Sequence, residues 1–137
     1  MADFSMNGTG GVECVTMPLD KTTITAIGKE YDGAKGKAVT LTDNNTVGYG
    51  SDGEPLFGVI RKVESDGYAT VQVKGFACGV TADVTKTTGE NPVAKTVIGT
   101  LAAVDGSGGI KSAADGIIGR GYITSVDAVT GEADIIM

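Results

Sequence analysis

Histidine and tryptophan are absent from this chain, and aromatic residues make up only 5% of it. Without histidine, the side chain most often used as a general base and as a metal ligand is missing. The carboxylates are scattered along the chain and stand mostly beside glycine in expected turns. We therefore expect a protein that is not an enzyme and that uses no cofactor or metal ion.

The chain also lacks a basic patch and a long apolar run. Its formal net charge is −6, whereas a protein that binds nucleic acid through phosphates needs a basic face. No apolar stretch approaches the length that spans a bilayer, and the first residues do not look like a signal peptide. We expect neither nucleic acid nor membrane as a partner, and synthesis in a cytoplasm.

Cysteine is scarce, with Cys14 and Cys78 as its two occurrences. Each lies in an apolar, strand-like run, far from the other in sequence. We expect reduced thiols that act as small buried side chains. A disulfide or a reactive thiol is the alternative.

What the chain does contain is 22 glycines and a long internal repeat. At an offset of 63 positions, residues 36–73 fall on residues 99–137, so that Gly36 meets Gly99 and Gly58 meets Gly121. One inserted residue then makes the offset 64, and Gly67 meets Gly131. Each copy has short apolar runs separated by glycine turns and ends in an alternating strand, the pattern of a strand with one buried face.

This pattern predicts an all-β fold, a small β-barrel or β-sandwich with two similar halves and a flexible N-terminal arm. About 40 residues bury too little apolar surface alone, so the halves must pack together. We expect one β-domain over residues 13–137, with similar halves 36–73 and 99–137 and a surface connection over 80–95. The predicted core is Val39, Leu41, Val47, Val59, Val63, Val71, Val73, Val104, Ile110, Val126 and Ile135.

The segments before the repeat receive separate predictions. Residues 1–12 are polar and glycine-rich, and we expect a flexible arm in which Phe4, Met6 and Val12 are spaced apolar anchors for a partner. An ordinary frayed terminus is the alternative. Residues 22–27, with the sequence TTITAI, predict a strand because they are rich in β-branched residues.

Two motifs suggest chemistry but fit turns better. Residues 48–53 match the pattern G-x-G-x-x-G, yet the following residues predict a strand where a dinucleotide site needs a helix. The segments 43–45 (DNN) and 105–109 (DGSGG) lack the full ligand spacing of a calcium loop. Glycine and aspartate in such positions are typical of turns.

Residues 36–75 resemble the head decoration, or capsid cement, proteins of tailed phages, and the closing run from 104 to 137 is similar to the same family. The resemblance covers about residues 22–137. It implies a small β-domain, a homotrimer, that sits on the outer surface of the virion, binds the major capsid protein and stabilises the shell. The matching positions are Gly36, Val39, Leu41, Thr46, Val47, Gly48, Asp52, Gly53, Glu54, Pro55, Phe57, Gly58, Val59, Asp66, Gly67, Thr70, Val71, Gln72, Val73 and Gly75.

A ligand-binding module, such as a carbohydrate-binding sandwich on a phage or cell surface, is the competing hypothesis. Sugars bind to exposed aromatic side chains, and four tyrosines are the polar aromatic residues of this chain. They are Tyr31, Tyr49, Tyr68 and Tyr122.

Overall fold

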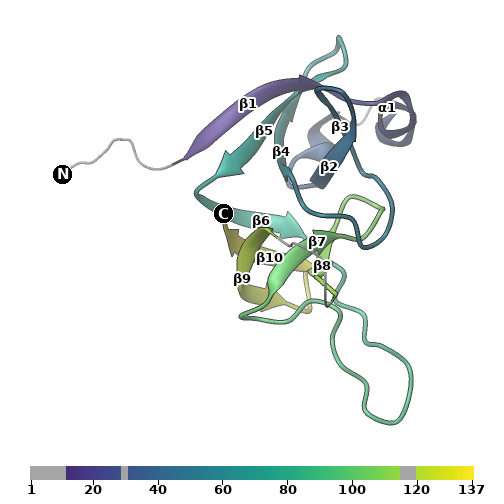
Figure 1. The fold of residues 1–137 in the computed structure, drawn as a ribbon, viewed down its shortest axis with the longest axis vertical. Coiled ribbons are helices and arrows are strands. Elements are labelled where there is room, and N and C mark those ends of the chain that lie inside the picture. Colours follow the sequence, from purple (N-terminus) through teal and green to yellow (C-terminus); the bar gives the residue numbers. More distant parts are fainter. Residues whose placement is uncertain (1–11, 29–30, 115–119) are drawn as a thin grey trace, which may run out of the picture.

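Two five-stranded antiparallel sheets form the body of the molecule (Figure 1). The computed structural model describes residues 12–28, 31–114 and 120–137. The all-β prediction is confirmed. The first sheet has the order β1 (Glu13–Pro18), β5 (Tyr68–Lys74), β4 (Gly58–Val63), β2 (Ala38–Asp43) and β3 (Thr46–Gly48). The second has the order β6 (Phe76–Thr81), β10 (Glu132–Ile136), β9 (Arg120–Asp127), β7 (Leu101–Val104) and β8 (Ile110–Ser112).

The internal repeat is visible in this strand order. The order β5-β4-β2-β3 in the first sheet corresponds to β10-β9-β7-β8 in the second. The correspondence also includes the edge strands, since β1 pairs with β5 as β6 pairs with β10. We call residues 13–74 the N-terminal unit and residues 76–137 the C-terminal unit. The connection expected over 80–95 begins inside β6, which ends at Thr81.

Equivalent backbone hydrogen bonds hold the two units in the same shape. The Asp20 N–H donates to the Val47 carbonyl at 2.9 Å, and the Asp83 N–H donates to the Ile110 carbonyl at 2.8 Å. Beside each bond lies an isolated parallel bridge, Leu19 with Val47 and Ala82 with Ile110. In each unit the sheet therefore curls until its two edges meet at one point without closing into a full barrel.

Each unit has an apolar cluster of its own, and one of them joins the units. The cluster of the N-terminal unit lies between its sheet, helix α1 (Lys21–Ile27) and the short 3-10 helix η1 (Tyr31–Ala34). The cluster of the C-terminal unit also contains Ala38, Leu56 and Val59 of the N-terminal unit. The two halves thus share a core, as the small size of each half requires.

The strand predicted over residues 22–27 is wrong, because these residues form most of helix α1. The Asp20 carboxylate accepts a hydrogen bond from the Thr23 N–H at 2.7 Å and so caps the first turn. Thr23 and Ile27 lie four residues apart on one helical face, and both are buried. Capping and burial outweigh the weak helix propensity of the β-branched residues.

Most of the predicted core is confirmed, but the assignment of Leu41 to the core is wrong, because 49% of the surface of this residue is exposed. Val73 and Val126 are only partly buried at the margins of the clusters. The expectation of buried cysteines is also wrong, because Cys14 and Cys78 are both free and exposed. Cys14 lies near the free end of β1, and Cys78 lies on the edge strand β6.

Candidate interaction surfaces

Strand β1 is an exposed edge of the first sheet. It pairs with β5 on one side, and residues 13–16 are exposed on both faces of the strand. Val12 is 55% exposed and Val15 is 38% exposed, while the Glu13–Lys74 ion pair at 3.3 Å lies in solvent. Figure 1 shows this strand reaching out from the body towards the N-terminus. An edge with exposed apolar side chains can accept a further strand from a partner.

The predicted anchor residues fall only partly within the described structure. Val12 precedes β1 and is exposed, as a contact residue must be in the free protein. Phe4 and Met6, and with them the predicted arm up to residue 11, lie outside the described residues. The sequence pattern missed the contribution of β1 itself, because its apolar residues resemble those of a buried strand.

A long loop over residues 83–98 is the second projecting feature (Figure 1). It stands where the N-terminal unit has helices α1 and η1. Among residues 84–90, which correspond to α1, Gly89 has a φ of 129°, which a helix does not allow, and Pro92 follows two residues beyond the segment. The loop exposes Val93 by 55% and Ile98 by 62%, so it offers apolar side chains away from the sheets.

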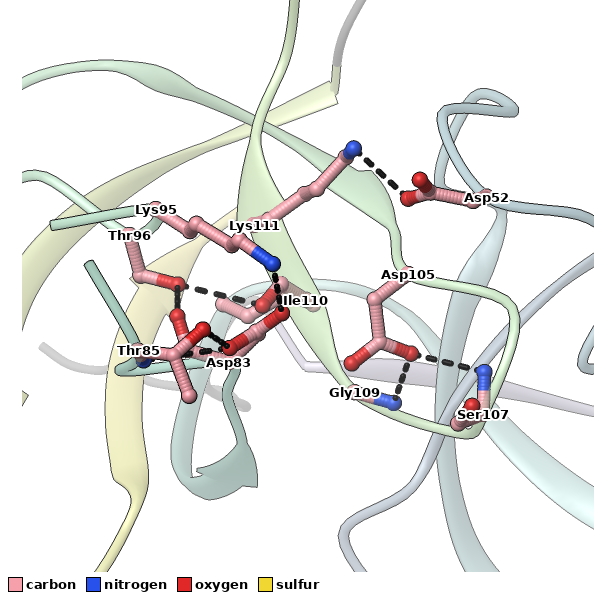
Figure 2. A network of polar contacts seen from close by, with 10 residues as sticks. All are labelled: Asp52, Asp83, Thr85, Lys95, Thr96, Asp105, Ser107, Gly109, Ile110 and Lys111. Atoms are coloured by element: carbon pink, nitrogen blue, oxygen red, sulfur yellow. Dashed lines mark hydrogen bonds and ion pairs between the residues drawn. The ribbon is translucent and has the colours of Figure 1, made fainter. Parts of the chain in front are cut away.

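Polar contacts fix the base of this loop to the C-terminal unit (Figure 2). The Thr96 hydroxyl, only 2% exposed, lies 2.7 Å from the Asp83 carbonyl oxygen and 3.1 Å from that of Ile110. The Asp83 carboxylate accepts a 2.6 Å hydrogen bond from the Thr85 hydroxyl and pairs with Lys95 at 3.5 Å. The hydrogen bond from the Thr85 side chain is the largest influence on the Asp83 pKa, which lies below its ordinary value. The loop therefore leaves the body from a rigid base.

Both segments considered as calcium loops, 43–45 and 105–109, are turns. The Asp105 carboxylate accepts hydrogen bonds from the Ser107 N–H at 2.7 Å and the Gly109 N–H at 2.9 Å (Figure 2). Asp43 similarly accepts from the Asn44 N–H. Within residues 12–28, 31–114 and 120–137, no group of three or more potential metal-ligating side chains occurs. The glycine-rich segment 48–53 continues through a turn into β4.

A polar hollow of about 450 Å³ lies between α1, strand β2 and the segment over residues 49–54. Its two carboxylates already accept hydrogen bonds from the backbone. Asp20 caps α1, and Glu54 accepts from the Ser51 N–H at 2.6 Å. These carboxylates shape the turns around the hollow.

The four tyrosines are divided among separate environments. Tyr31 and Tyr49 pack against the apolar cluster of the N-terminal unit, and burial raises the pKa of Tyr49. Tyr68 and Tyr122 are exposed, but they belong to different sheets. The arrangement therefore gives no support to a sugar platform built from all four.

No helix in the described part of the chain is long and apolar enough to cross a membrane. The chain matches no family model, no curated protein and no solved structure.

Proposed function

We propose that this protein decorates and stabilises the head of a tailed phage. In this role it binds, as a homotrimer, to the outer surface of the shell that the major capsid protein forms. The observation that carries the proposal is the free edge of β1, which exposes the apolar residues Val12 and Val15. The resemblance of residues 36–75 to capsid cement proteins supports the same role.

The contact we propose is strand addition at β1. Its unpaired backbone groups supply directional hydrogen bonds to an extended segment of the shell, and Val12 and Val15 supply apolar contact. A strand that is exposed on both faces gains much from being covered, because apolar surface leaves water there. Repeated copies on one shell compensate for a modest affinity of each contact through multivalency.

The test is co-sedimentation with capsids that lack decoration. We expect deletion of residues 1–12 combined with Val15→Lys to weaken binding at least about tenfold, equivalent to roughly 1.4 kcal/mol. The melting temperature should change little, because residues 12 and 15 are exposed. The matched control is Val129→Lys, on the turn between β9 and β10, where the side chain is 95% exposed.

A second pair of variants separates the contact site from the function. Val93→Lys and Ile98→Lys alter the loop over residues 83–98 and leave β1 intact. Loss of binding in these variants alone would move the contact to the loop and disprove the β1 site. If the unaltered protein does not bind undecorated shells, the proposed function itself is wrong.

A further inference from the structure

Three exposed apolar side chains form a row across the second sheet. Phe76, Ile136 and Tyr122 are 48%, 47% and 58% exposed. Ile136 pairs directly with Phe76 in β6 and with Tyr122 in β9. Directly paired residues of antiparallel strands lie on the same face of a sheet. The three side chains are therefore one patch, which we call the outer row, and not separate exposed residues.

Two of the three equivalent positions in the N-terminal unit are buried, whereas the third, Cys14, which pairs with Gln72 as Phe76 pairs with Ile136, is exposed. Val59 corresponds to Tyr122 and Gln72 to Ile136, and Val59 pairs with Gln72 as Tyr122 pairs with Ile136. Ala38 extends the buried row by pairing with Val59. The exposed fractions of Ala38, Val59 and Gln72 are 0%, 0% and 3%. Tyr122 and Ile136 are thus exposed where their counterparts in the N-terminal unit, Val59 and Gln72, are buried.

The C-terminal unit covers the buried residues Ala38, Val59 and Gln72 of the N-terminal unit. Ala38 and Val59 belong to the apolar cluster of the C-terminal unit. The Ala38 N–H donates to the Gly108 carbonyl at 2.7 Å, and the Gln72 side chain donates to the Phe76 carbonyl at 3.1 Å. Within the chain, this face of a unit is therefore a contact surface for another unit.

We propose that the outer row of the C-terminal unit, Phe76, Ile136 and Tyr122, is the docking surface for a second copy of this chain. Inside the chain, the outward face of the N-terminal unit is covered by the C-terminal unit that follows it. A second copy of the chain would cover the same face of the C-terminal unit in the same way. Such an interface is heterologous, because different surfaces of the two copies meet. Its side chains are of the aromatic and apolar kinds that occupy the centres of protein interfaces.

The proposal specifies the surface for the self-association that the proposed function includes, but it requires no capsid. Isolated apolar residues on a protein surface are ordinary. The outer row differs because three neighbouring strands contribute to it in register and because the counterparts of Tyr122 and Ile136 are covered. Contiguous apolar patches of this kind mark interaction sites.

Sedimentation velocity over a concentration series tests the proposal on the full chain. We expect Tyr122→Lys and Ile136→Lys each to weaken self-association at least about tenfold. The matched control, Tyr68→Lys, alters a 45% exposed tyrosine of the first sheet and should associate like the unaltered protein. Thermal melting of each variant at low concentration identifies any that fails to fold. An unaltered protein that stays monomeric at every concentration, or row variants that associate normally, would overturn the proposal.

Alkylation of the cysteines gives an independent measurement without substitution. Cys78 lies two residues after Phe76 in β6, so its side chain projects from the same face. Association should slow the labelling of Cys78 several-fold, with Cys14 of β1 as the reference thiol in the same molecule. Equal labelling of Cys78 in associated and dissociated protein would place the contact elsewhere. Capsid binding is measured separately. Row variants that associate normally leave the proposed function standing, whereas a protein that stays monomeric removes its homotrimer but not its capsid binding. Failure to bind shells leaves this surface standing.

Discussion

Val71 occupies the centre of the N-terminal unit, where it is fully buried and pairs with Val15 and Ile60 in neighbouring strands. We expect Val71→Asp to lower the free energy of unfolding by roughly 3–5 kcal/mol, because it buries an unpaired charge. Urea unfolding measures the change. Val129→Asp introduces the same side chain at a 95% exposed position and should leave the midpoint nearly unchanged. Equal midpoints for the two variants would contradict the assigned core.

At the scale of single residues, alternation identified most of the core but failed where a strand is covered on both faces. In β2 the consecutive residues Ala38, Val39 and Thr40 are all buried, because one face meets each apolar cluster. Leu41 and the residues after it extend beyond both clusters and are exposed. The sequence contains no signal for the point where a strand leaves the core. For the same reason it could not separate an exposed Cys78 from a buried one.

Helix α1 depends on its N-cap more than most helices, because it has only 7 residues. Asp20→Ala removes the carboxylate that accepts the Thr23 N–H, and we expect a loss of about 1 kcal/mol of stability. Asp20→Asn keeps a capping oxygen and should lose less. Denaturant unfolding at neutral pH compares the two variants. A larger loss for the asparagine variant would show that capping is not the main role of Asp20.

At low pH, the native Asp20 should no longer stabilise the protein more than asparagine does at this cap. Burial raises the Asp20 pKa, but hydrogen bonds from Thr23 and Thr42 outweigh it and hold the pKa below the ordinary 3.8. A carboxyl group whose pKa is lower in the folded protein than in the unfolded chain stabilises the folded protein. This stabilisation is complete above the pKa of the unfolded state and is lost as the pH falls through the pKa of the folded state. The stability difference between the unaltered protein and Asp20→Asn should therefore decline below about pH 3.8. A difference that grows with acid would contradict this assignment.

At the scale of elements, the sequence predicted the strands of the repeat better than the segments between them. Residues 21–27 and 84–90 occupy equivalent places, yet one forms a helix and the other part of a loop. Both segments follow an aspartate that accepts a backbone N–H, Asp20 from Thr23 and Asp83 from Thr85. The difference follows from the buried positions of Thr23 and Ile27, against Gly89 in the loop. Burial depends on tertiary contacts that residue composition does not contain. The projecting loop, the alternative contact site, was therefore only partly predictable.

For the whole molecule, the repeat seen in the sequence is shorter than the repeat in the structure. Strands β1 and β6 are equivalent edge strands, but ECVTMP and FACGVT share little beyond apolar character. An edge strand with exposed residues tolerates many side chains, so the backbone pairing is preserved without a residue pattern. The outer row escaped the sequence analysis for a related reason. Alternation shows that Tyr122 faces outward, but only the strand pairing shows that it lies beside Ile136.

The shared core predicts that the two units unfold as one. Ala38, Leu56 and Val59 would leave the apolar cluster of the C-terminal unit if the N-terminal unit unfolded alone. We therefore expect a single calorimetric transition in which the van't Hoff and calorimetric enthalpies agree. Two separate transitions would contradict a shared core.

Arg120 is the side chain through which this coupling can be weakened. Its guanidinium donates to the Phe57 carbonyl at 2.8 Å and to the Val73 carbonyl, both in the N-terminal unit. Arg120→Met keeps an apolar stem but leaves both carbonyls without this charged donor, so we expect a loss of about 2–3 kcal/mol of stability. Lys62→Met is the matched control, since that side chain is 68% exposed and pairs only with Glu64 among the described ion pairs. If the two variants lose equal stability in the calorimeter, Arg120 does not connect the units, and the apolar cluster alone must hold them together.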